Sequence, residues 1–244
     1  ALLTPTAYWG GGTTIPFSPT SIPNLAGWYD ASDTTSYIKS GTTIIGISSQ
    51  GTYGDSLGVI GNSNPVAATQ QNGLDCLYFD GNTAFSNTNT DPLVSSNGLH
   101  FAVGVFRPMV VDADKDSLWS IDSGAYNYAV SANSSTQFWG EVDAGGGVGT
   151  YGVLGPISTV NRENSWIMYT VAFTKLQSSN YIIHWLNGGV PGSSSFGVWY
   201  MNYLTNLDVN QKLRIMANRT GGRKLEGRFG ELLLFSGDCG ITGS

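Results

Sequence analysis

Residues 165–188 read SWIMYTVAFTKLQSSNYIIHWLNG, and this stretch decides how the chain is expected to fold. Its first part, WIMYTVAF, is apolar on both faces of an extended chain, which is typical of a strand in the middle of a sheet. A second apolar run, YIIHWL, ends at Asn187-Gly188, a dipeptide that accepts positive φ at both central positions of a tight turn. The stretch therefore predicts two β-strands followed by a turn.

Similar short apolar runs follow one another from Pro23 onward, separated by clusters of Gly, Asn and Ser. Within KLRIMAN at 212–218, apolar side chains alternate with Lys212, Arg214 and Met216, as expected of a half-buried strand. Many short strands without helices between them favour two packed sheets over βαβ units. The sequence thus predicts an all-β fold, an antiparallel two-sheet sandwich.

The length of 244 residues suits a single large β domain. Only 11% of the residues are charged, against about 25% in typical soluble domains. Residues 1–22 contain Pro5, Pro16 and Pro19 and a WGGG turn, which predicts an extended arm before the first packed strand. We therefore expect an arm at 1–22 and one sandwich at 23–244.

The net charge of −6 and the pI of about 4.7 give no global support to a nucleic-acid partner. No apolar run approaches the roughly 18 residues of a membrane span, and no secretory signal is expected at the start. Six of the eleven basic residues nevertheless fall in one short stretch, which is either a solvated hairpin face or a docking surface for an acidic partner. They are Lys212, Arg214, Arg219, Arg223, Lys224 and Arg228.

Cys76 and Cys239 lie far apart in the sequence, and the spacing leaves open whether they pair. His100 and His184 are not spaced for a zinc site. Asp112, Asp114 and Asp116 have the 1, 3, 5 spacing of a calcium loop, but Ser117 and Ser123 occupy positions where an EF-hand needs Gly and Glu. The acidic run is therefore a weak candidate for Ca²⁺ or a solvated turn, and no other cofactor is expected.

Four segments, in this order, resemble the laminin-G-like and concanavalin-A-like jelly rolls. They are LAGWYDASDTTSYI at 25–38, LYFDGNTAFS at 77–86, the stretch at 165–192, and LRIMANRTGGRKLEGRFGELLLF at 213–235. The resemblance implies a jelly-roll sandwich over roughly residues 23–236. Beyond Phe235 the match to the family fails.

Laminarinase-type glycoside hydrolases of this superfamily carry E-x-D-x-x-E on one strand. Here Glu141 and Asp143 match the first two acids, but Gly146 stands at the third. Retaining hydrolysis needs a nucleophile and a separate acid about 5–5.5 Å away, and only Glu163, Glu226 and Glu231 could replace the missing acid. We therefore expect a protein that is not an enzyme.

Sugar binding does not require a pair of catalytic carboxylates, because an exposed aromatic face with neighbouring amides and carboxylates suffices. A strand with a period of two places Trp139, Glu141 and Asp143 on one face. A second candidate set is Trp199, Tyr200 and Tyr203. Both sets are predicted carbohydrate-binding residues.

A W-x-D-A-S-D motif behind a Pro-rich lead-in, PFSPTSIPNL at 16–25, resembles structural proteins of bacterial viruses, in which jelly rolls decorate heads, fibres or tails. The resemblance implies a virion-surface protein that contacts host glycans, with residues 1–22 anchoring it to other virion proteins or to further copies of itself. A secreted lectin module is the alternative, and a laminarinase-type hydrolase is the more remote one.

Overall fold

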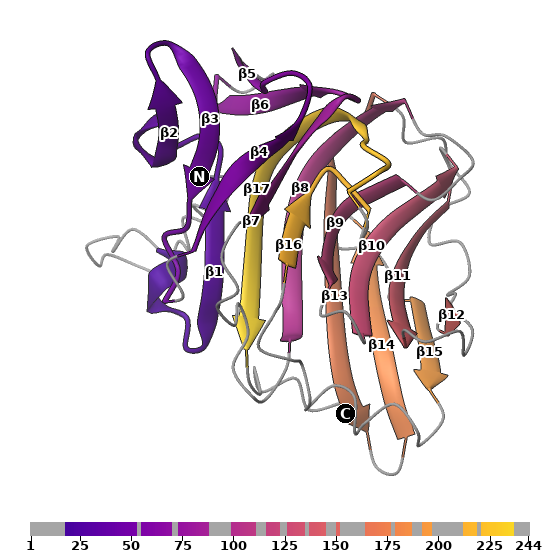
Figure 1. The fold of residues 1–244 in the computed structure, drawn as a ribbon. Helices are drawn as coiled ribbons and strands as arrows, with labels where there is room; N and C mark the ends of the chain where they lie inside the picture. The colour runs from indigo at the N-terminus through magenta and orange to yellow at the C-terminus, as the bar shows by residue number, and fades with distance from the viewer. Residues whose placement is uncertain are drawn as a thin grey trace.

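A computed structural model describes residues 18–52, 55–69, 73–87, 99–110, 116–122, 126–134, 137–144, 150–151, 164–176, 179–186, 192–196, 212–218 and 221–236. These residues form two antiparallel sheets that lie face to face (Figure 1). The helical elements among them are two single 3-10 turns, η1 (Pro19–Ser21) and η2 (Thr34–Ser36). The predicted all-β, two-sheet fold is confirmed.

The eight-stranded sheet has β8 (Leu99–Val110) and β17 (Glu226–Ser236) at its centre. On one side of this pair follow β13 (Ile167–Leu176), β14 (Ser179–Leu186) and β15 (Gly192–Phe196). On the other side follow β6 (Asp75–Asp80) and β5 (Val66–Thr69), and β1 (Leu25–Asp30) also pairs with β17. The strand predicted from WIMYTVAF is β13, and it lies inside the sheet as expected.

The nine-stranded sheet runs in the order β12, β11, β10, β9, β16, β7, β4, β3, β2. Its strands are β12 (Thr150–Tyr151), β11 (Gln137–Ala144), β10 (Tyr126–Ser134), β9 (Asp116–Asp122), β16 (Lys212–Ile215), β7 (Thr83–Asn87), β4 (Ser56–Gly61), β3 (Thr43–Ser48) and β2 (Tyr37–Ser40). Neighbouring strands β16 and β9 are about ninety residues apart in sequence. This pairing brings distant polar side chains onto one surface.

The core fills the space between the sheets with alternate residues from each strand. Phe79 of one sheet meets Phe85 of the other edge to face, with ring centroids 5.2 Å apart. Phe106 and Phe229, on the central strands β8 and β17, lie 5.5 Å apart and are fully buried. The residues between these core positions therefore point away from the core, out of either sheet.

The structure differs from the sequence-based predictions in the strand at 212–218 and in the predicted arm at 1–22. Leu213 and Ile215 lie in the core as the alternation in KLRIMAN predicts, but Arg214 and Met216 are buried as well. Residues 1–17 of the predicted arm lie outside the described residues, whereas Pro19 is buried in η1 and Ile22 packs on Leu25, Leu233 and Phe235. No helix of the described residues is long and apolar enough to cross a membrane.

Candidate functional site

The face of the nine-stranded sheet that points away from the core carries a continuous row of paired positions across seven strands. Five of the seven positions hold glycine, serine or alanine, and the other two hold arginine and glutamate. From β3 to β11 the row is Gly46, Gly58, Ser86, Arg214, Ser120, Ala129 and Glu141. We call this surface, together with the two rows below, the polar face.

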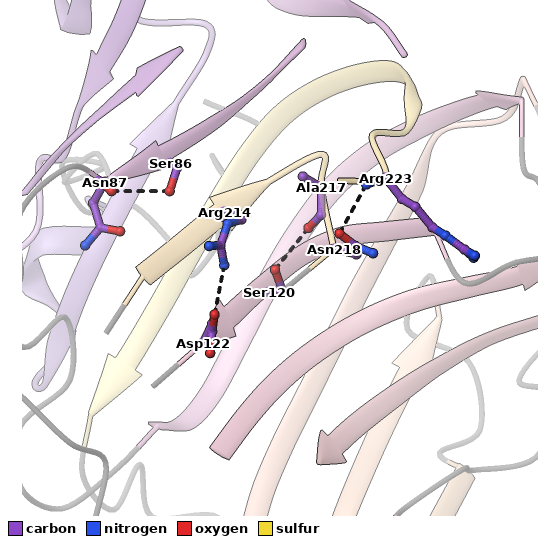
Figure 2. Close-up of polar contacts among 8 residues, drawn as sticks. All are labelled: Ser86, Asn87, Ser120, Asp122, Arg214, Ala217, Asn218 and Arg223. Carbon is purple, nitrogen blue, oxygen red and sulfur yellow. Dashed lines mark hydrogen bonds and ion pairs between the residues drawn. The ribbon is translucent and has the colours of Figure 1, made fainter. Parts of the chain in front are cut away.

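Arg214 is the buried cation of the polar face. Its side chain is 9% exposed, and Nη1 lies 3.5 Å from Oδ2 of Asp122, whose side chain is 26% exposed (Figure 2). Burial lowers the pKa of Arg214 and Asp122 acts in the opposite direction, so the guanidinium stays charged. Within the described part of the chain this long contact is its only polar one, although a guanidinium carries five N–H donors.

The hairpin between β16 and β17 holds Arg214 in place. Leu225 N–H donates to the Met216 carbonyl, and Asn218 closes the turn by accepting from the Arg223 backbone N–H at its side-chain oxygen (Figure 2). A Cβ at Gly221 would lie 3.4 Å from Nε of Arg214, so the turn passes directly beside the guanidinium. Ser120 Oγ donates to the Ala217 carbonyl at 3.0 Å and ties β9 to the same hairpin.

Two further rows complete the polar face beside Arg214. One pairs Lys212, Asp122, Asn127 and Asp143 across β16, β9, β10 and β11. The other pairs Ser117, Ser131 and Trp139, with the two serine Oγ atoms 3.0 Å apart. The register therefore places Trp139, Glu141 and Asp143 on one strand face, as predicted, while their side chains lie outside the described part.

The chemistry of the polar face matches hydroxyl-rich ligands. Arg214 and Lys212 supply donors and Asp122 supplies acceptors. The hydroxyls of Ser86 and Ser120 donate to the Asn87 and Ala217 carbonyls. Residues of opposite charge on adjacent strands can bind the two lone pairs and the proton of one hydroxyl or of neighbouring hydroxyls. The described residues around Arg214 in its row, Ser86, Ser120 and Ala129, are small and themselves buried.

The predicted basic surface does not exist as one patch, because β16 and β17 belong to different sheets. Arg214 is a correction in particular: it is buried against Asp122 and cannot face a protein partner in the way an exposed arginine does. Lys212 and Arg223 are exposed, and Lys224 is half-buried in the hairpin. Arg228 lies on the far side of the molecule, and Arg219 is outside the described residues.

Most residues of the other predicted sites, which are the second aromatic set, the aspartate run and the cysteine pair, lie outside the described residues. Trp199, Tyr200, Tyr203, Asp112 and Asp114 lie outside the described residues, and Asp116 is the first residue of β9. In the described ranges no group of three or more His, Cys, Asp or Glu side chains could hold a metal. Cys76 is a buried free thiol, and its possible partner Cys239 is outside those ranges.

The sequence analysis missed Asp122, Ser120 and Ser86 as members of a site. A signal for two of them was present, since Ser120 and Asp122 alternate with Trp119 and Ile121 in DSLWSID. The three residues come together with Arg214 only because β16 pairs with β9 and β7. No local sequence pattern predicts the pairing of strands that lie so far apart in the chain.

No protein-family model matches the sequence, and a search of curated protein sequences gives no match. Among solved structures, domain 4 of AbnA, an extracellular GH43 arabinanase from Geobacillus stearothermophilus in complex with arabinotriose, aligns with a TM-score of 0.59 at 13% identity, covering 88% of this chain and 93% of that domain. The fold is a jelly-roll sandwich.

Two other structures share this fold with the chain. Tailspike protein 2 of an Escherichia coli O157:H7 bacteriophage aligns with a TM-score of 0.52 at 14% identity, covering 75% of this chain and 26% of the tailspike. The CBM40 of a Ruminococcus gnavus sialidase, bound to α2,3-sialyllactose, aligns with a TM-score of 0.50 at 12% identity, covering 66% of this chain and 89% of that module. At these identities the similarity concerns the fold.

Proposed function

We propose that the protein is a non-enzymatic jelly-roll module that binds a glycan through its polar face. The observation that carries the proposal is Arg214, a nine-tenths buried guanidinium whose only polar contact among described residues is 3.5 Å long. Buried polar groups in proteins nearly always have partners. Sugar hydroxyls near Ser86 and Ser120 would accept from its remaining donors.

The charges of the polar face favour a neutral sugar there. Arg214 is already beside Asp122, and the register adds Glu141 and Asp143 to the same face. A carboxylated sugar would meet these acidic groups, whereas a neutral sugar can donate its hydroxyl protons to them and accept from Arg214. Trp139, on the third row, supplies the aromatic surface on which sugar rings stack.

The absence of enzymatic activity is part of the proposal and is supported by where the glutamates lie. Glu226 and Glu231, two of the three candidates for a replacement acid, are on β17 of the opposite sheet. They cannot reach a sugar on the polar face, since a core about 10 Å thick separates the sheets. Glu163, the third candidate, is outside the described residues.

We propose a virion surface as the setting, with residues 1–22 as the anchor and a host glycan as the ligand. The tailspike similarity supports it at the level of the fold, beside the sequence motif at 16–38. A secreted module is the second candidate, favoured by the alignment over 93% of an arabinanase domain that was solved with arabinotriose. Size-exclusion chromatography distinguishes the two settings, because deletion of residues 1–17, which keeps the packed Pro19 and Ile22, should dissociate an oligomer only if the arm anchors one.

A glycan array probed with the full chain, followed by calorimetry on the best neutral ligand, tests the polar face. Arg214→Gln and Asp122→Asn each remove a charge-assisted hydrogen bond and should weaken binding roughly tenfold to hundredfold. Lys39→Gln, at an exposed lysine of β2, is the matched control and should bind as the parent does. Unchanged affinity in folded Arg214→Gln protein, or an array without neutral ligands, would rule out this function.

A further inference from the structure

The opposite surface of the sandwich, the outward face of the eight-stranded sheet, holds two arginines directly facing each other. Arg107 of β8 and Arg228 of β17 are paired in register, and both are half-buried. Facing residues on adjacent strands have Cβ atoms about 5 Å apart, and like charges at that distance repel. The pair therefore needs an explanation.

Neither arginine forms an ion pair with a carboxylate within the described residues. Arg107 Nε donates to the Asn164 carbonyl at 2.9 Å, and Arg228 Nη1 lies 3.4 Å from the Thr69 carbonyl. Arg228 Nε is buried without a hydrogen-bond partner. Arg107 is thus held by one neutral contact, and Arg228 lies against the Thr69 carbonyl and the Cys76 thiol. These contacts leave further donors of both guanidiniums for a ligand.

The same register row continues from the arginine pair to an aromatic and then an aliphatic residue. Tyr78 of β6 faces Arg228, and Val66 of β5 faces Tyr78. Tyr78 is half-buried and donates its hydroxyl to Glu226 Oε1 at 3.0 Å, so its ring is fixed. Val66 is 59% exposed at the sheet edge. An aromatic ring and an apolar side chain beside two cations suit a ring that carries a negative group.

We infer that Arg107 and Arg228 bind the carboxylate or sulfate group of an acidic sugar residue whose ring lies over Tyr78 and Val66. The donors of two neighbouring guanidiniums can bind the oxygens of such a group, and the anion offsets their mutual repulsion. Glu226 and Asp80 face each other in register and are acidic neighbours on this face. Glu226 accepts the Tyr78 hydroxyl, and Asp80 accepts from Ser63 and from the Asn82 backbone N–H. This site is independent of the polar face, since it uses the other sheet.

Isothermal titration of the full chain with four probes tests the site: a galacturonate trisaccharide, a sulfated trisaccharide, the matching neutral trisaccharide, and inorganic sulfate. We expect binding of the first two probes, with Arg107→Gln and Arg228→Gln each weakening it roughly tenfold to hundredfold. Arg107→Lys keeps the charge but loses the planar fork, and should recover only part of the affinity. Lys39→Gln, at an exposed lysine of β2, is the charge-matched control and should change nothing.

The same variants should lose the rise in melting temperature that the acidic probe causes, while circular dichroism shows an intact fold. No binding of either acidic probe, or full affinity for them in folded Arg228→Gln protein, would overturn the site. Binding of inorganic sulfate as tight as that of the sulfated sugar would overturn its assignment to a sugar and indicate a free-anion site.

Discussion

The buried carboxylate of Glu231 should make the stability of the protein depend on pH. Glu231 is 3% exposed on β17 and accepts the indole N–H of Trp28 at 2.8 Å. Burial raises its pKa above the ordinary 4.5 and nearby Asp30 adds to the rise, while the bond from Trp28 opposes it. The folded state therefore binds this proton more tightly than the unfolded state, so stability falls as pH rises from 4.5 through the raised pKa.

Glu231→Gln should remove this dependence, because the amide still accepts from Trp28 and does not ionise. The free energy of unfolding of the variant, relative to the parent, should increase from pH 4 to pH 8 in urea titrations. All other titrating groups are common to the two proteins and cancel in the difference. Parallel pH profiles for the two proteins would contradict the shifted pKa.

Glu231→Ala separates the hydrogen bond from the charge. It removes the acceptor of the partly buried Trp28 N–H, and leaving such a donor without a partner costs roughly 1–3 kcal/mol. We expect the free energy of unfolding of Glu231→Ala to fall by about that amount relative to Glu231→Gln at pH 7. A smaller difference would mean that solvent satisfies the indole.

At the scale of elements, the central strand β8 depends on a glycine that lies under an aromatic ring. A Cβ at Gly104 would come within 2.3 Å of Cε2 of Phe106, whose ring is fully buried against Phe229. Gly104→Ala should therefore destabilise the protein by about 1–3 kcal/mol through overpacking.

Gly230→Ala on the neighbouring β17 is the matched control for Gly104→Ala. There the nearest atoms lie 3.3–3.4 Å from the added Cβ, and they belong to Val105 and Trp166. Its cost should be clearly smaller in the same urea titrations. Equal costs for the two substitutions would show that the Phe106 ring moves aside.

The elements themselves were largely predictable, because local alternation and turn dipeptides report on strands directly. WIMYTVAF became an interior strand, and the period of two in QFWGEVDA correctly put Trp139 with Glu141 and Asp143. The basic cluster at 212–228 was misjudged for a physical reason. Closeness in sequence says nothing about which sheet each strand joins, and β16 and β17 join different ones. Arg107, the partner of Arg228, lies about 120 residues away in sequence.

For the whole molecule, the two proposed sites lie on the two outward faces of one sandwich, so they should act independently. The polar face belongs to the nine-stranded sheet and the Arg107–Arg228 pair to the eight-stranded one. A close-packed core lies between them, and sites more than about 10 Å apart with no shared partners couple by only about 0.3–0.5 kcal/mol.

A titration of the neutral glycan in the presence and absence of saturating acidic trisaccharide measures this coupling. We expect its Kd to change by no more than about twofold, which is the equivalent of that energy. Arg214→Gln should weaken only neutral binding and Arg228→Gln only acidic binding, so the double variant should weaken each as much as the corresponding single variant does. Competition between the two ligands, or a loss of both in either single variant, would show that they share one site and would leave one of the two faces without a role in binding.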